Sequence, residues 1–195
     1  MGNPALAPNE RFTYRHYRTW PDEERWELID GHAWAMSPAP MTRHQELSGR
    51  LFLEIGVFLK GKPCKVFEAP FDVLLPTSVE ADDDVDTVVQ PDISIFCDTS
   101  RIAKRGARGA PDWVIEVLSA RTAKKDFETK YQLYQRHGVR EYWIVDPGAA
   151  AIHAWRIDAN GFFGEETIYE EGDSAPSTVL EGLIIDATQL FSDLI

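Results

Sequence analysis

Residues 113–118 read Trp-Val-Ile-Glu-Val-Leu, a nearly continuous apolar run that holds one carboxylate, Glu116. Such a run is typical of an interior strand that is buried on both faces of a sheet. Alternation with period two places Glu116 on the same face as Val114 and Leu118. An ionised carboxylate at that depth is costly unless a cation or strong hydrogen-bond donors compensate for it. The stretch therefore predicts an interior strand and, within it, an acid that needs a partner.

The sequence on either side of this strand alternates between helix and strand patterns. Asp30-Gly31 is the preferred dipeptide of a two-residue hairpin turn. Thr42 and Gln45 form a capping-box pattern ahead of one helix, and Thr122 and Gly138 mark the start and end of another. In chain order we expect a short helix at 13–19, strands at 26–29 and 32–36, a helix from 42, strands at 65–69, 72–75, 92–96 and 113–118, a helix at 123–137, strands at 141–145 and 151–156, a hairpin around Asn160-Gly161 and a short helix at 187–194. This order predicts an α/β to α+β fold, with a mixed central sheet flanked by helices, an N-terminal hairpin and antiparallel C-terminal strands.

Length and composition favour one globular domain over residues 1–195, with residues 1–9 as a flexible tail. No apolar run approaches the roughly 18 residues that span a bilayer, and no basic segment followed by an apolar one opens the chain. These features predict a cytoplasmic protein without a membrane partner. The only two cysteines, Cys64 and Cys97, lie in apolar, β-prone stretches, so we expect small buried thiols rather than a disulfide.

The charge is distributed unevenly along the chain. The formal net charge of −12 argues against a general nucleic-acid coat, which needs a broad basic face. Residues 101–140, however, hold ten of the 20 basic residues and only four acidic ones. If a phosphate backbone binds this chain, we expect it to approach that block, with weak and strongly salt-dependent affinity.

A second acid, Asp92, opens the strand at 92–96 directly after Pro91. Two acids that begin or interrupt neighbouring strands suggest a divalent metal held by carboxylates, for which Mg²⁺ or Mn²⁺ is the natural choice. The alternative is a structural pair of acids satisfied by Arg, Lys or backbone amides. From the residues alone, the two interpretations carry about equal weight.

Four further side chains are candidates for the same site. Asp126 and Lys130 are four apart on one helix, which is typical of an exposed ion pair but also places the Lys130 ammonium near Glu116 if the helix returns over the strand ends. His44 lies on the inward stripe of its helix, and Glu27 follows Trp26 in the first hairpin. Either is more often a satisfied structural residue than a catalytic one.

Three blocks of this sequence resemble a bacterial family of restriction endonuclease-like proteins, the Uma type. The first runs from Trp26-Glu27-Leu28-Ile29-Asp30-Gly31 through Met36, Pro38 and Pro40 to His44-Gln45, the second joins Gln90-Pro91-Asp92-Ile93 to Ala110-Pro111-Asp112 and Ile115-Glu116-Val117-Leu118-Ser119, and the third holds Asp126, Lys130, Tyr134, Gly138-Val139 and residues 141–147. The family belongs to the PD-(D/E)XK nuclease superfamily. The resemblance implies its fold, a metal held by Asp92 and Glu116, and completion of the metal shell by the carbonyl of Val117.

One position departs from the superfamily pattern. The lysine expected two residues after the second acid is Leu118 here, so either Lys130 takes its role from the following helix or the site is weakened. The leading hypothesis is Mg²⁺- or Mn²⁺-dependent hydrolysis of DNA phosphodiester bonds, with Lys130 orienting a water and Asp126 fixing the lysine. Non-specific phosphate contacts are expected from Arg101, Lys104, Arg105, Arg108, Arg121, Lys124 and Lys125. A homodimer is expected as well, because cutting both strands together needs two sites.

Two other functions stay open at this point. A non-catalytic interaction module with the same fold agrees with Leu118 and the overall acidity, and it predicts no Mg²⁺ or Mn²⁺ binding. A metal-dependent hydrolase of small phosphate esters agrees with the acidic surface, and it predicts turnover of a chromogenic ester without salt-sensitive DNA affinity. The chain has no Gly-rich phosphate loop that would favour the second.

Overall fold

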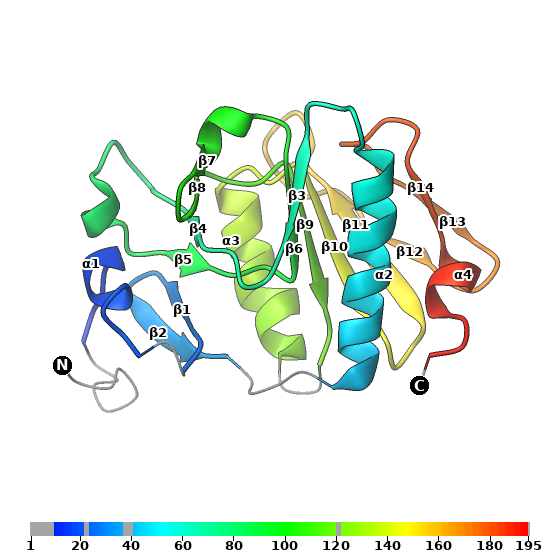
Figure 1. Cartoon of the computed structure of the whole chain (residues 1–195), viewed down its shortest axis with the longest axis horizontal. Coiled ribbons are helices and arrows are strands. Elements are labelled where there is room, and N and C mark those ends of the chain that lie inside the picture. Colours follow the sequence, from blue (N-terminus) through cyan, green and yellow to red (C-terminus); the bar gives the residue numbers. More distant parts are fainter. Residues whose placement is uncertain (1–9, 22–23, 37–40, 120–121, 195) are drawn as a thin grey trace.

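The computed structural model describes residues 10–21, 24–36, 41–119 and 122–194. The expected tail at 1–9, Arg121, and Pro38 and Pro40 of the first block lie outside the described residues. Figure 1 shows two sheets side by side, with the longest helix, α2 (Thr42–Phe58), in front of the larger one.

The larger sheet has six strands in the order β12-β11-β10-β9-β6-β3. Their bounds are β3 (Lys65–Glu68), β6 (Ile93–Phe96), β9 (Trp113–Val117), β10 (Glu141–Asp146), β11 (Ala151–Arg156) and β12 (Thr167–Tyr169). Only β9 and β10 are parallel, and every other neighbouring pair is antiparallel. The predicted mixed sheet is confirmed, and β9 is the interior strand that residues 113–118 indicated, because it lies between β6 and β10.

One face of this sheet is covered by α2, the short helix α4 (Ala187–Phe191) and the hairpin of β13 (Ser174–Pro176) and β14 (Ile184–Asp186). From α2, Leu47, Leu51 and Ile55 are fully buried there, each worth roughly 1.5–3 kcal/mol of hydrophobic stabilisation. The expected capping box is wrong. Thr42 is already the first helical residue, and no side chain caps the helix at Met41.

The other face is covered by the helix that follows β9. It begins at Ala123, and its middle, η4 (Lys125–Lys130), is a π-helix that continues into α3 (Tyr131–Arg136). The sequence predicted an unbroken α-helix, and the π turn is a correction that propensity cannot foresee. Thr122 does occupy the N-cap position, since its carbonyl accepts the Asp126 N–H, but its hydroxyl binds the Ser119 N–H rather than the helix. Gly138 ends the helix as expected, with a φ of 73°.

A second sheet, in the order β2-β1-β5-β4-β8-β7, packs beside the first. It comprises β1 (Trp26–Ile29), β2 (His32–Ala35), β4 (Val73–Leu74), β5 (Val88–Val89), β7 (Ile102–Ala103) and β8 (Gly106–Arg108), with α1 (Tyr14–Tyr17), η2 (Asp82–Asp84) and η3 (Thr99–Arg101) around it. The hairpin is confirmed, since both turn residues have the positive φ that its turn requires, 49° at Asp30 and 77° at Gly31. The sheet as a whole was not predicted, because strands of two residues leave no periodic signal.

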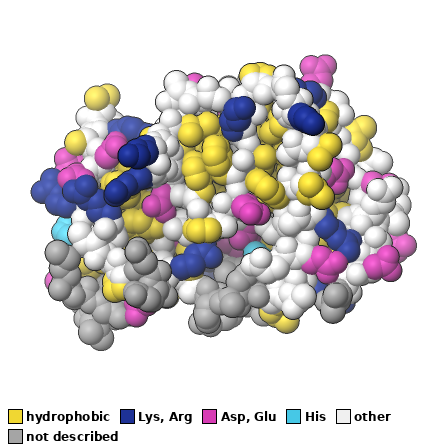
Figure 2. All heavy atoms as spheres, in the orientation of Figure 1, with side chains coloured by type: hydrophobic (Ala, Val, Ile, Leu, Met, Phe, Trp, Pro, Cys, Tyr) yellow, Lys and Arg dark blue, Asp and Glu magenta, His cyan; other side chains and the backbone are white. Residues whose placement is uncertain are grey.

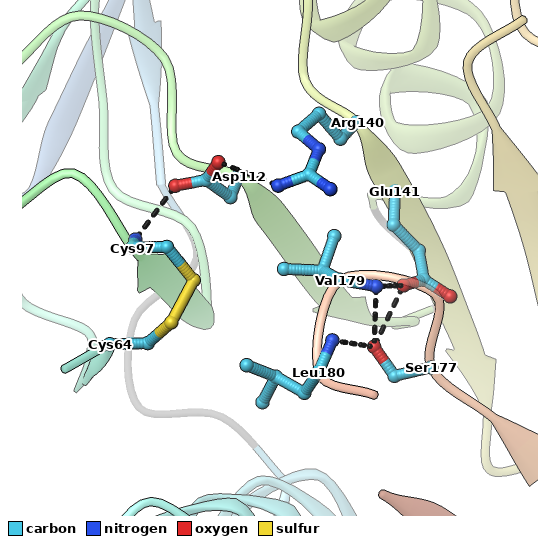
Figure 3. The surroundings of a disulfide bond; sticks show 8 residues. All are labelled: Cys64, Cys97, Asp112, Arg140, Glu141, Ser177, Val179 and Leu180. Carbon is cyan, nitrogen blue, oxygen red and sulfur yellow. Dashed lines mark hydrogen bonds and ion pairs between the residues drawn. A yellow bond between two sulfur atoms is a disulfide. The ribbon is translucent and has the colours of Figure 1, made fainter. Parts of the chain in front are cut away.

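The two cysteines form a disulfide, which corrects the expectation of free thiols. The antiparallel register of β3 and β6 pairs Lys65 with Phe96, so Cys64 and Cys97 stand at the next opposed position (Figure 3). They are 33 residues apart in sequence, and only the strand pairing makes them neighbours.

A buried carboxylate anchors the C-terminal hairpin on the larger sheet. Glu141, at the start of β10, is fully buried, and its Oε2 accepts hydrogen bonds from the Ser177 hydroxyl at 2.8 Å and from the Thr178 and Val179 N–H groups at 2.8 and 3.1 Å (Figure 3). Its Oε1 accepts from the Trp143 indole at 2.9 Å. These neutral donors satisfy the charge, so this acid holds the chain together without facing a pocket.

Candidate active site

The two acids predicted to share a metal lie at the same end of neighbouring strands. Asp92 precedes β6 and Glu116 lies in β9, and the antiparallel register pairs Ile93 with Ile115. The Val117 N–H donates to Asp92 Oδ2 at 2.8 Å, and the Asp92 N–H points at Glu116 Oε2 at 3.5 Å. The sheet therefore fixes both carboxylates side by side.

Lys130 reaches this pair from the π-helix. Its Nζ lies 2.7 Å from Glu116 Oε1, 3.1 Å from Glu27 Oε1 and 3.8 Å from Asp126 Oδ1. All four side chains are at most 4% exposed. The structure thus brings together Glu116, Lys130, Asp126 and Glu27, four of the six residues singled out in the sequence.

The fifth and sixth, His44 and Asp92, meet on the side of α2. His44 Nε2 lies 3.1 Å from Asp92 Oδ2, while its buried Nδ1 has no partner among the described residues. Burial by itself would lower the pKa of this imidazole, but the hydrogen bond to Asp92 and the nearby carboxylates outweigh burial and raise it.

Leu118 explains why the lysine comes from a helix. Its side chain is buried in the apolar cluster that contains Val114 and Leu133, on the face of β9 that the helix covers. The helix that packs on this face supplies the ammonium instead, from Lys130.

Glu27 and Lys125 extend the network. Lys125 Nζ lies 2.6 Å from Glu27 Oε2, and the Gln90 N–H donates to Glu27 Oε1 at 3.1 Å. Burial would raise the pKa of Glu27, but Lys130 and Lys125 outweigh it and lower the pKa to about 2. In this structure the Lys125 ammonium is paired with Glu27, and its expected contact with a phosphate backbone stays a prediction.

The cluster carries more negative than positive charge. Four carboxylates, Glu27, Asp92, Glu116 and Asp126, face two ammonium groups, those of Lys125 and Lys130. Burial, followed by repulsion from Asp92, Asp126 and Glu27, raises the pKa of Glu116 to about 8 against the pull of Lys130. The pKa of Asp126 is raised by burial in the same way.

A small pocket of about 80 Å³ opens onto these groups. Its walls include Asp92, Glu116, Asp126, His44 and Lys130, together with Arg25 and Gln90. The cavity is large enough for ions and waters, and its charged groups are accessible to a ligand that binds at its mouth.

Comparison with known proteins places this arrangement in a family. Residues 14–188 match the Uma2 family, described as "Putative restriction endonuclease". The chain belongs to the Uma2 family. The resemblance identified in the sequence is therefore confirmed.

A solved structure has a similar fold. A crystal structure of "a putative nuclease belonging to DUF820 from Anabaena variabilis ATCC 29413" superposes with a TM-score of 0.75 at 22% sequence identity, covering 94% of this chain and 99% of that one. This likeness confirms the fold class. No curated protein matches the sequence significantly, and none of the helices in the described residues has the length and apolar character to cross a membrane.

The donor set of this Uma2 chain fits a hard divalent cation in a sparse site. Within the described residues, no group of three His, Cys, Asp or Glu side chains is placed to hold a metal. Asp92 and Glu116 nevertheless present adjacent oxygens, the cluster holds four carboxyl groups against two ammonium groups, and in the described structure the buried Asp126 Oδ1 accepts no hydrogen bond. Mg²⁺ is commonly held by one or two carboxylates plus waters and substrate phosphates, which these groups match.

The cations of the basic block at 101–140, expected to contact phosphates, are mostly paired with acidic side chains. Most of its described cations are neutralised by acids, in the pairs Arg101–Asp98, Arg108–Asp82, Lys124–Glu128, Lys125–Glu27, Lys130–Glu116, Arg136–Asp30 and Arg140–Asp112. In the described part of the block, Lys104 and Arg105 alone form no ion pair. The positive charge seen along the sequence is therefore not a positive surface.

Sequence reasoning missed three residues of the site. Tyr134 was assigned to the core, yet its hydroxyl donates to Glu116 Oε1 at 2.7 Å. Arg25 and Gln90 line the pocket and bind each other, with Arg25 Nη2 donating to Gln90 Oε1 at 2.7 Å. Gln90 precedes the Pro91-Asp92 pair, and that adjacency was the available signal.

Proposed function

We propose that this chain is a metal-dependent nuclease that hydrolyses DNA phosphodiester bonds at the Asp92–Glu116 pair. The observation that carries the proposal is the position of Lys130, whose ammonium lies 2.7 Å from Glu116 although the strand itself has Leu118 where nucleases of this superfamily have lysine. Membership of a family described as restriction endonucleases supports the same reaction.

In this proposal each residue has a defined task. Asp92 and Glu116 hold Mg²⁺ or Mn²⁺, with the Val117 carbonyl as the third protein ligand that the family resemblance implies. When bound, the cation supplies a Lewis acid and a bound water of lowered pKa. Lys130 donates hydrogen bonds to the attacking water or to phosphate oxygens as negative charge grows on them.

The surrounding residues position these groups. Asp126 and Glu27 hold the Lys130 ammonium, and the Tyr134 hydroxyl orients the Glu116 carboxylate. His44 fixes Asp92 Oδ2, and Asp92 itself lines the pocket. A lysine held between carboxylates stays protonated, which a charge-stabilising role requires, and the pKa of Lys130 is raised accordingly, because the nearby carboxylates outweigh burial.

Plasmid cleavage tests the proposal. Supercoiled DNA is incubated with the wild type and with Asp92→Ala and Glu116→Ala in Mg²⁺, in Mn²⁺ and in chelator, with the exposed acid of Asp98→Ala as the matched control. We expect nicked or linear DNA only from the wild type and the control, and only with metal. Equal cleavage by the wild type and both site variants would reject the assignment.

A second candidate is supported by the charge pairing itself. Lys130 lies between three carboxylates and most of the described cations of the basic block are paired with acids, as expected of an interaction module that has kept the fold but lost the chemistry. Titration calorimetry separates the two candidates. Binding of Mg²⁺ or Mn²⁺ that disappears in Asp92→Ala favours the nuclease, and absence of binding favours the module.

If the chain cuts both DNA strands together, a second copy has to bring a second site. The homodimer therefore stays a proposal, and sedimentation of the chain with and without duplex DNA tests it.

A further inference from the structure

A second groove, of about 410 Å³, adjoins the candidate active site. Arg25 and Gln90 line both hollows, so the two are neighbours. The rest of the groove wall combines aromatic and cationic side chains, among them Tyr14, Tyr17, Trp20, Trp26, Arg18 and Arg105, with two carboxylates, those of Glu24 and Asp72. Its volume lies within the range of binding sites for ligands of moderate size.

We propose that this groove binds an unpaired stretch of the DNA strand on which the active site acts. The inference rests on the proposed function and narrows its substrate from DNA in general to DNA with single-stranded character. Three observations carry it: the aromatic wall, the polar link to the active site, and the intermixed positive and negative side chains around the groove.

The aromatic wall is a connected row of rings. The centroids of Tyr14 and Tyr17 lie 6.0 Å apart in a stacked arrangement, those of Tyr17 and Trp20 lie 5.3 Å apart, and those of Trp20 and Trp26 lie 6.0 Å apart. Tyr14, Tyr17 and Trp20 are partly exposed, so ring surface faces the groove. Unpaired bases stack on such rings, whereas paired bases keep their faces inside the duplex.

A chain of hydrogen bonds links this wall to the catalytic pocket. The Tyr17 hydroxyl donates to Asp72 Oδ1 at 2.8 Å, and Gln90 Nε2 donates to both the Tyr17 hydroxyl and Asp72. The same Gln90 accepts from Arg25 and, through its backbone, donates to Glu27 beside Lys130. The groove is therefore held in place relative to the active site, and a strand seated in it leads to Asp92 and Glu116.

The charges around the groove favour a single strand over a duplex. A duplex carries one negative charge per roughly 1.7 Å of axis and needs many cations along its length. Here basic and acidic side chains are intermixed over α1, η2 and the β7–β8 hairpin, as Figure 2 shows, and Arg18 is paired with Asp83. A strand that gains its affinity from stacking needs few cations, and Arg105 is one that the groove provides.

The β7–β8 turn offers a matched pair of variants. Lys104 and Arg105 are adjacent, exposed and free of ion pairs in the described structure, but only Arg105 lines this groove. Removing either side chain changes the net charge by the same amount. A difference between Arg105→Ala and Lys104→Ala therefore reports contact with the groove rather than overall electrostatics.

The test is fluorescence anisotropy in chelator, so that no cleavage occurs. The probes are a short labelled oligothymidine and a labelled duplex of the same length. We expect the wild type to bind the single strand about tenfold more tightly than the duplex, Arg105→Ala to lose about fivefold, and Lys104→Ala to lose less than twofold. Trp20→Ala, checked for folding by thermal melting, should lose about tenfold, as typical for one stacked base.

Two outcomes would overturn the inference. One is duplex binding as tight as single-strand binding, and the other is equal loss in Arg105→Ala and Lys104→Ala. Because binding is measured without metal, failure of the chemistry does not affect it. If the chain binds the single strand but never cuts plasmid, the proposed nuclease function is refuted and the proposed binding groove stands. If the chain cuts duplex DNA but shows no preference for the single strand, the nuclease function stands and the binding groove is refuted.

Discussion

Two buried carboxylates on neighbouring parallel strands have opposite surroundings in this molecule. Glu116 on β9 and Glu141 on β10 are 3% and 0% exposed and lie toward opposite ends of the paired strands. Glu141 is satisfied by a serine and a threonine hydroxyl, two backbone N–H groups and an indole, with the Arg156 Nε at 3.6 Å. Glu116 lines a pocket together with Asp92, Asp126, Lys125 and Lys130, and Lys130 also contacts the buried Glu27.

The contrast separates a buried acid that stabilises the fold from a buried acid that is available for chemistry. Both acids interrupt apolar strands, so neither position in the sequence by itself indicates function. What distinguishes Glu116 is an excess of carboxyl groups over ammonium groups around it and access from a pocket. A fully satisfied acid stabilises the fold, whereas an acid in a surplus of like charge is free to bind something else.

The largest expected effect is on cleavage by Asp92→Asn. We expect the rate to fall about a thousandfold, since a Lewis acid contributes several kcal/mol to the transition state. The free energy of unfolding should stay within about 1 kcal/mol of the wild type or rise, because one charge is removed from a repulsive cluster while the acceptor for the Val117 N–H is kept. Plasmid cleavage and urea unfolding measure the two. A variant that loses activity only because it unfolds would contradict this contrast.

At Glu141 we expect a loss of stability without a loss of activity. Glu141→Leu leaves the Ser177 hydroxyl and the Thr178 and Val179 N–H groups without their acceptor, at a cost of about 3 kcal/mol of unfolding free energy. Melting should fall by roughly 6–12 °C for a chain of this length. Ser177→Ala, which removes one donor, should cost about 1 kcal/mol. Cleavage per folded molecule should be unchanged in both, and a selective loss of activity would show that Glu141 is more than an anchor.

How much of the fold could be predicted from the sequence depends on whether each feature is determined by neighbouring residues or by residues far apart in the chain. Residues 113–118 were enough to place β9 inside the sheet, and the Asp30-Gly31 dipeptide was enough for the hairpin, because both signals are local. The second sheet and the disulfide depend on pairing between distant segments, which no local pattern contains. Sequence order alone does not tell which strands become neighbours.

The candidate site divides in the same way. Asp92, Glu116 and Lys130 were found because each is an anomaly in its own element or matches a family position. Tyr134 was missed because an aromatic residue on an apolar stripe is ordinarily core, and its hydroxyl contact with Glu116 exists only in three dimensions. The charge of the 101–140 block was correctly counted, but acidic partners such as Asp30 and Asp82 come from elsewhere in the chain, which a count along the block does not show.

The last expected effect is the pH dependence of stability without metal. The pKa of Glu116 is about 8 in the folded chain against 4.5 for the free side chain, so between those values the native state binds more protons than the unfolded state. Stability contributed by this group is therefore complete below pH 4.5 and is lost as the pH rises through 8, by at most about 1.4 kcal/mol per pH unit. The raised pKa values of Asp126 and His44 act in the same direction.

Thermal melting in chelator from pH 5 to pH 9 measures this slope, and three comparisons assign it. Glu116→Gln should flatten the slope of stability against pH. Glu141→Gln should lower stability at every pH and leave that slope unchanged. Mg²⁺ should stabilise the wild type more at pH 8 than at pH 5, because the ion binds the ionised carboxylate and competes with protons for it. If stability instead rose with pH over this window, or if the slope were as steep in Glu116→Gln as in the wild type, the raised pKa would not belong to Glu116, and the distinction between the two buried acids would fail.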